Sequence, residues 1–318
     1  MDRTFPPLPH PLTDTGEERK TGVEIEFSGV TEDQTADIVC RRFGGRITAR
    51  DAHQINIADT DIGAVEIVLD TALRKASDNR LVDLGLSLGR AIIPVEIVTE
   101  PLDRAQMKQL DRLCDDLRDA GAHGTANGIL LGFGVHLNIE IVSEDAPHTL
   151  RTVLAFGLLE DWLRDSMQID HTRRILPFIE PWPRDFVIGL ARDRENLTFD
   201  GVRRLYAERV NSRNHGLDLL PVFKHADERL FARHFPDHDQ TKGRPAFHYR
   251  LPDSRIDEAA WSLRQEWINW CRIERLAAQA ERLHQLAKAF LDHETKGSAD
   301  RASWATYCAE GFGADATL

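Results

Sequence analysis

The chain has 318 residues, with 40 lysines and arginines against 52 aspartates and glutamates, so its formal net charge is −12. That length can bury one large core or two ordinary ones, and the acidic balance argues against nucleic acid or an anionic membrane as a partner. The four cysteines lie far apart, no apolar run reaches the roughly 20 residues that span a bilayer, and no signal peptide is recognisable, so we expect a reduced, cytoplasmic protein.

The predicted elements alternate between short β-patterned runs and longer helical runs, which favours an α+β fold with a largely antiparallel sheet. Residues 1–18, rich in proline and then acidic, are expected to form an extended or disordered arm. Strands are expected at 22–28, 53–58, 63–69, 91–99, 129–142 and 245–251, helices at 32–43, 103–120, 148–167, about 200–210 and 256–293, and a structured loop at 175–185. No linker divides the chain, so we expect a single domain over 19–295 and a tail over 296–318.

The last predicted helix, 256–293, has apolar residues at alternating steps of three and four. They are Ile273, Leu276, Ala280, Leu283, Ala287 and Phe290. This stripe can pack on the protein's own body or form a coiled coil with a second copy. About two and a half heptads is short for a coiled coil, which favours packing within the chain.

Near the start of the chain, a predicted strand has two glutamates on one face. Glu24 and Glu26 are two residues apart, so both project to one side while Val23, Ile25 and Phe27 project to the other. Like charges side by side on a strand face are destabilising without a counter-charge, and a divalent cation would supply that charge. The alternative is the solvent-exposed face of an edge hairpin.

The same arrangement recurs in later predicted strands. Glu66 and Glu96 each lie within the apolar sequence Val-Glu-Ile-Val, where an ionised carboxylate is costly unless it is paired or binds a metal. The predicted strands that follow carry polar side chains on one face and apolar ones on the other. Those polar side chains are His136, Asn138, Glu140, His248 and Arg250.

If these polar faces converge, the sequence predicts an oxygen-rich metal site. Its members would be Glu24, Glu26, Glu66, Glu96 and His136, and this mixture of carboxylates with one or two imidazoles suits Mg²⁺ or Mn²⁺. Such ions usually bridge substrate phosphates, whose oxygens Arg209, Arg213 and Arg250 would neutralise. Taken singly, each residue has a plainer interpretation, as a hydrogen-bonded sheet residue or a surface ion pair.

Five segments follow one another in the order found in a known family. They are TGVEIEFSG (21–29), VEIVTEPL (95–102), GFGVHLNIE (132–140), RNHGLDLLPVF (213–223) and RPAFHYRLPDSRID (244–257). Over about three quarters of its length the chain resembles the amidoligases of the glutamine synthetase and glutamate–cysteine ligase superfamily. The resemblance implies a curved, mostly antiparallel sheet with helices on its convex face and an active site holding ATP and divalent cations on its concave face. It also implies that a small amino-acid or peptide substrate is ligated to an amine through an acyl phosphate.

Position by position, the resemblance implies two metal sites. Glu24 would share one ion with His136, and Glu26 would share the other with Glu66 and Glu96. His248 stands where the synthetases usually carry a glutamate ligand. Imidazole still binds Mg²⁺ or Mn²⁺, with one negative charge fewer.

Further residues are expected to contact the nucleotide or to take part in the chemistry. By resemblance, Arg213 and Arg250 would hold the ATP phosphates and the transition state, with Arg209 beside them. Asn138, which replaces a second histidine of the family pattern, would be another cofactor contact. The attacking amine must be neutral, and Glu100, just beyond Glu96, is our hypothesis for the general base.

Two alternatives stay open. One is a metal-dependent phosphotransferase of the same fold, and the other is a non-catalytic nucleotide- or ligand-binding relative, which His248 would favour. We expect small-molecule carboxylate and amine substrates, but segments 170–200 and 224–244, which are expected to shape the entrance, carry no motif that identifies them. A glutaminase-type or peptidase partner enzyme would point to peptide or polyamine conjugates, and the sequence leaves the oligomeric state open.

Overall fold

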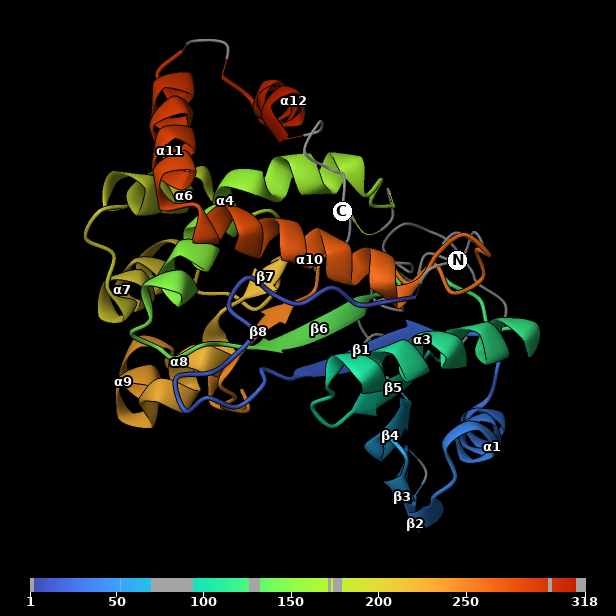
Figure 1. Cartoon of the computed structure of the whole chain (residues 1–318). Helices are drawn as coiled ribbons and strands as arrows, with labels where there is room; N and C mark the ends of the chain where they lie inside the picture. The colour runs from blue at the N-terminus through green and yellow to red at the C-terminus, as the bar shows by residue number, and fades with distance from the viewer. Residues whose placement is uncertain are drawn as a thin grey trace, which may run out of the picture.

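The computed structural model describes residues 3–51, 53–69, 94–125, 132–170, 173, 179–296 and 299–312. Within them the fold is α+β, with one open antiparallel sheet in the order β2-β3-β4-β5-β1-β6-β8-β7 (Figure 1). The strands are β1 (Thr21–Phe27), β2 (Arg46–Arg50), β3 (Gln54–Thr60), β4 (Gly63–Leu69), β5 (Val95–Thr99), β6 (Val135–Glu140), β7 (Leu217–Asp218) and β8 (Ala246–Tyr249).

Ten α-helices accompany the sheet in the described part of the chain. They are α1 (Glu32–Phe43), α3 (Arg104–Asp119), α4 (Pro147–Ser166), α6 (Arg184–Arg192), α7 (Phe199–Arg209), α8 (Leu220–Ala226), α9 (Glu228–His234), α10 (Leu263–Ala278), α11 (Ala280–Glu294) and α12 (Arg301–Phe312). A 3₁₀ turn, η1, covers Pro236–His238. None of the described helices is long and apolar enough to cross a bilayer.

The first strand of the chain lies near the centre of the sheet. β1 pairs with β5 on one side and with β6 on the other, although both follow it by many residues. The register places Glu26 opposite Glu96, and Glu24 opposite His136. Directly paired residues project to the same face of a sheet, so this topology gathers the polar side chains of several strands on one surface.

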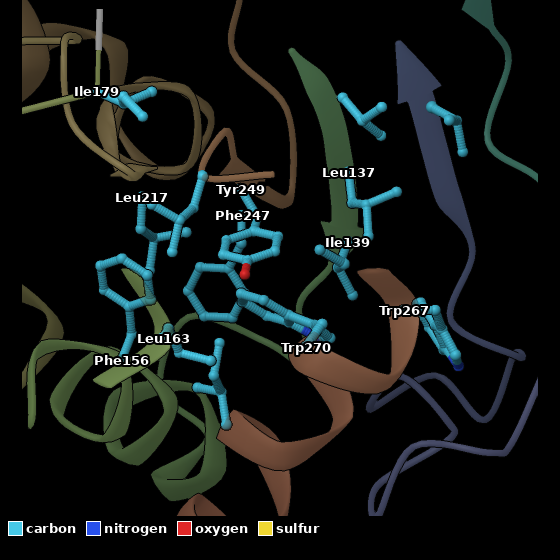
Figure 2. Packing of buried hydrophobic residues seen from close by; sticks show 14 of the residues in the cluster. Leu137, Ile139, Phe156, Leu163, Ile179, Leu217, Phe247, Tyr249, Trp267 and Trp270 are labelled. Atoms are coloured by element: carbon cyan, nitrogen blue, oxygen red, sulfur yellow. The ribbon is translucent and has the colours of Figure 1, made fainter. Parts of the chain in front are cut away.

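The other face of the sheet forms the hydrophobic core with α4 and α10. The ring of Trp270 in α10 lies 5.5 Å from that of Phe247 and 5.2 Å from that of Tyr249, centroid to centroid. Figure 2 shows these rings beside Leu137 and Ile139 of β6. Each such side chain contributes roughly 1.5–3 kcal/mol when fully buried, so the core fixes which face of each strand remains for polar residues.

The segment before β1 is extended and packs on the helices. Phe5 and Leu8 are buried, and Trp267 donates its indole N–H to the carbonyl of Pro6 at 2.8 Å. Arg19 forms a buried, two-pronged ion pair with Glu274 of α10. These contacts attach the chain firmly two residues before the central strand begins.

The prediction of one continuous helix over 256–293 is wrong. Helix α10 begins only at Leu263, and Gln279, with φ −99° and ψ 74°, interrupts the path between α10 and α11. The apolar stripe continues across the break, because both helices bury it within the same chain. α10 packs on α4, and α11 packs on α6 and α4, so the stripe is packed within the chain as favoured from sequence.

Several short elements were not predicted. They are strands β2 and β7, helices α6, α8 and α9, and helix α12, which lies within the expected tail 296–318. The expected loop 175–185 ends earlier than predicted, because α6 begins at Arg184. Residues 91–93, 129–131 and 175–178 of the predicted elements lie outside the described residues. All four cysteines are free thiols.

Candidate functional site

Glu24 is the centre of the polar face of the sheet. Its carboxylate accepts hydrogen bonds from His136 Nδ1 at 2.7 Å and from Asn138 Nδ2 at 2.9 Å. Arg244 Nη1 lies 3.4 Å away, and His248 Nε2 lies 3.7 Å away. Strands β1, β6 and β8 and the segment before β8 therefore all meet at one carboxylate, as expected if the polar faces converge.

Glu24, His136 and His248 form the first group that could hold a metal ion, with one ligand atom from each lying within 4.8 Å of the others. Nε2 of His248 is buried and makes no hydrogen bond, yet it faces the Glu24 carboxylate. A buried nitrogen without a partner costs about 1–3 kcal/mol, and a cation would satisfy it. One carboxylate and two imidazoles suit Mn²⁺ and are compatible with Mg²⁺.

The second group consists of Glu26, Glu96 and His136, again with one ligand atom each within 4.8 Å. The backbone N–H of Gly134 donates to Glu26 Oε2 at 2.7 Å, which orients that carboxylate. The other oxygen, Oε1, lies 3.9 Å from His136 Nε2. His136 is thus shared between the two groups, one ring nitrogen facing each.

Burial and hydrogen bonding together set the protonation states of Glu24 and His136. Burial acts to raise the pKa of Glu24, but the hydrogen bond from His136 and the nearby imidazole of His248 outweigh it and hold that pKa well below its usual range. Burial lowers the pKa of His136 to about 4, although Glu24 acts in the opposite direction. An ionised carboxylate beside a neutral imidazole requires the proton on Nδ1, so the Nε2 lone pair points toward Glu26. These are the protonation states that bind metals.

Asp218 of β7 completes the site and was missed in the sequence. It is fully buried and accepts hydrogen bonds from His248 Nδ1 at 3.2 Å and from the backbone of Leu220 at 2.9 Å. A carboxylate on the far nitrogen of a metal-binding imidazole fixes its tautomer and orientation. Asp218 belongs to the RNHGLDL segment, but a two-residue strand shows no alternation that would single it out.

The predicted arginines lie at different distances from the metal groups. Arg213 forms an ion pair with Asp218 at 3.2 Å and is 42% exposed. Arg250, two residues beyond His248, donates to the carbonyl of Arg213 at 2.6 Å and has a buried Nε without a partner. Arg209 instead forms an exposed ion pair with Asp185 at 3.2 Å, so its described contact is with helix α6 rather than with the metal groups.

A cleft of about 620 Å³ opens beside Glu24. Glu66 and Glu100 both line it, and Glu100 accepts a hydrogen bond from the backbone of Ala64 at 3.0 Å. Glu66 is exposed on β4 and belongs to neither metal group. Its predicted metal role therefore stays a prediction, while its position fits a contact with substrate.

Comparison with known proteins gives one family match. A family model described as "Putative amidoligase enzyme" matches residues 17–272. That span contains both candidate metal groups, Asp218, all three arginines and the cleft. A search of curated proteins found no match.

Proposed function

The chain belongs to the amidoligase family, and from that premise we propose that it is an ATP-dependent carboxylate–amine ligase acting on a small amino-acid or peptide substrate. The observation that carries this proposal is the pair of candidate metal groups that both include His136 on one face of the sheet, beside Arg250 and an open cleft. The family alone suggests amide formation, and the arrangement of these residues supports the use of a nucleotide.

The proposed reaction has two steps. A substrate carboxylate oxygen attacks the γ-phosphorus of ATP and releases ADP, which gives an acyl phosphate. A neutral amine then attacks the acyl carbon, the amide bond forms and inorganic phosphate leaves. Phosphorylation supplies the leaving group that a carboxylate lacks, so the protein has mainly to position the reactants and neutralise charge.

The residues of the polar face fit those tasks. Glu24 and His248 would hold one Mg²⁺ or Mn²⁺, with the Nδ1–H of His136 orienting Glu24, and Glu26, Glu96 and the Nε2 lone pair of His136 would hold a second. When bound, these ions would supply Lewis-acid stabilisation of phosphate oxygens. Arg250 and Arg213 offer guanidinium donors on the β7–β8 side of the metal groups, where they would bind phosphate.

Glu100 is the residue that we propose as general base. It lines the same cleft as Gly22 and Asn138, and its carboxylate lies beside Ala64. Replacing Glu100 by Gln should lower turnover about a hundredfold or more, the usual range for general-base catalysis, while ATP binding stays intact. A loss of ATP affinity in Glu100→Gln would contradict this role.

The proposal is tested by phosphate release. Purified protein would be incubated with ATP and Mg²⁺ or Mn²⁺ across a panel of amino acids, short peptides and amines, followed by mass spectrometry of positive reactions. A ligase yields an amide and free phosphate, whereas a phosphotransferase leaves phosphate on the acceptor. Absence of any ATP turnover across the panel would favour the non-catalytic relative and contradict the proposal.

A further inference from the structure

The cleft beside Glu24 has a floor of small side chains. Gly22, Ala64, Val98 and Ala246 line it from four strands. A Cβ on Gly22 would lie 3.4 Å from Asn138 Cβ, which is ordinary van der Waals contact, and the backbone φ of Gly22 is not positive. Glycine is therefore not required there by the backbone, and its effect is to leave room above the sheet.

The cations around this floor gather at one end, and two of the three lining carboxylates lie at the other. Lys20, Lys242 and Arg244 lie on the β6–β8 side, where Glu140 accepts a hydrogen bond from the backbone N–H of Lys20, and Glu66 and Glu100 lie on the opposite side, beside β4. Lys20, Lys242 and Glu66 are exposed, and among the described residues none of the three has an ion-pair partner. Opposite charges at the two ends of a cleft match a ligand that carries both charges itself.

Arg244 connects the cationic end of the cleft to the metal groups. Its Nη1 lies 3.4 Å from Glu24 Oε1, and its side chain is 42% exposed. Along β8 the residues on the polar face run from Ala246 in the cleft, through His248 in the first metal group, to Arg250. A carboxylate bound at Arg244 would therefore lie beside the first metal group.

The width of the cleft limits the size of the ligand. From β4 to β8 there are four strand spacings of about 4.8 Å, or roughly 19 Å. Long charged side chains reach inward from both ends, and an extended dipeptide or tripeptide spans about 7–11 Å. A single amino acid is too short to contact both ends, whereas a short peptide fits between them.

We infer that the cleft binds a short peptide with both ends free, its carboxylate at Arg244 and Lys242 and its ammonium group at Glu66. The assignment of the reacting end rests on the proposed function, because the peptide carboxylate is then the group that ATP phosphorylates. The binding itself does not depend on that chemistry. Glu66 thereby acts on substrate from the far end of the cleft, and it sets the preferred peptide length.

The test is equilibrium binding of Ala-Ala and Ala-Ala-Ala by calorimetry, each compared with its N-acetylated and its C-amidated form. In the unmodified protein, blocking either end should weaken binding at least about tenfold, as loss of a charge-assisted hydrogen bond does. In Glu66→Gln, N-acetylation should make little further difference. In Lys242→Ala, C-amidation should weaken binding less than it does in the unmodified protein, because only Arg244 then remains to bind the carboxylate. Lys288→Ala, an exposed lysine on α11, is the matched control and should bind as the unmodified protein does.

Two results would overturn the inference. One is equal binding of blocked and free-ended peptides, and the other is absence of binding by peptides of either length. Failure of this inference can be distinguished from failure of the proposed function. Peptide binding that requires both ends, without phosphate release, would contradict the ligase but not the cleft. Phosphate release only with substrates that lack either the carboxylate or the ammonium group would contradict the proposed peptide binding in the cleft but not the proposed ligase activity.

Discussion

Glu274 and Glu24 both accept hydrogen bonds from histidine, but only Glu274 is paired with a buried arginine. Both oxygens of Glu274 bind Arg19, at 2.7 and 2.9 Å, and that guanidinium is 1% exposed; His148 adds a third contact at 3.0 Å. The nearest guanidinium to Glu24 belongs to Arg244, lies 3.4 Å away and is 42% exposed.

The difference separates a structural cluster from a candidate functional one. Around Glu274 the charges balance within the protein, and the network joins the N-terminal segment to α10. Around Glu24, the buried carboxylates of Glu26 and Asp218 gather with two imidazoles on one face of the sheet, and the guanidinium that pairs with Glu24 is partly exposed. An arrangement that costs stability and is nevertheless built is typical of a binding site.

The largest expected effect is a loss of stability at the cluster around Glu274. Replacing Glu274 by Gln leaves the Arg19 guanidinium buried without its counter-charge, which should lower the free energy of unfolding by about 3–5 kcal/mol. Urea denaturation measures this change. Glu24→Gln is the matched control and should be far less destabilising. A comparable loss of stability in both variants would remove the distinction between the two clusters.

Low pH should also destabilise the protein through the cluster around Glu274. Burial tends to raise the pKa of Glu274, but hydrogen bonding from His148 and the charge of Arg19 outweigh it and lower the pKa to about 2. A carboxyl with a lowered folded-state pKa stabilises the fold above pH 4.5 and loses that contribution as pH falls toward 2. At about 1.4 kcal/mol per pKa unit this amounts to roughly 3 kcal/mol.

Denaturation curves between pH 7 and pH 2 would show this loss. The part of the acid dependence that belongs to Glu274 should be missing from Glu274→Gln. If that variant keeps the full slope below pH 4.5, another carboxylate is responsible.

At the cluster around Glu24, the expected effect is on metal binding rather than on stability. Glu24→Gln should weaken Mn²⁺ binding and lower any ATP-dependent turnover by about a hundredfold or more, since even outer-shell changes at metal sites cost 10–100-fold. Manganese affinity is measurable by calorimetry without substrate. Wild-type Mn²⁺ affinity in Glu24→Gln would show that the first metal group is not a metal site.

The smallest effect is expected at Asp218. Asp218→Asn keeps the shape of the side chain but weakens its hold on His248 Nδ1, so Mn²⁺ affinity should fall about 10–100-fold. Asp218→Ala removes the carboxylate altogether, so its Mn²⁺ affinity should fall at least as far. An unchanged affinity in both variants would mean that Asp218 serves only its contacts with Leu220 and Arg213.

The central part of the site was predictable because its residues lie in strands where polar and apolar side chains alternate. Glu24, Glu26, His136 and His248 each sit in a run whose other face is apolar, and the core against Trp270 forces those polar faces together. Glu96 follows the same rule. The glutamine synthetase type of fold, ATP and the identity of the ions remain proposals, because residue pattern alone does not determine them.

Other residues could not be found in this way. Asp218 lies in a strand of two residues, and Arg244 lies just outside a strand, so neither has a periodic context. Glu66 has the same Val-Glu-Ile-Val context as Glu96, but it projects from a strand farther from β1 and is exposed there. The break at Gln279 carries neither glycine nor proline, so no local signal marks it.

The central position of β1 has a consequence for synthesis of the protein. His248 follows Glu24 by 224 residues, and at about 5–20 residues per second the ribosome needs roughly 10–45 s to make that interval. Strand β6, the direct partner of β1, follows Glu24 by 112 residues at His136, and β8 is made only at the end of the interval. Contacts so distant in sequence form slowly. We therefore expect a metal ion, if the candidate groups hold one, to bind after the sheet has assembled, so that newly made chains should mature at the same rate whether or not manganese is supplied.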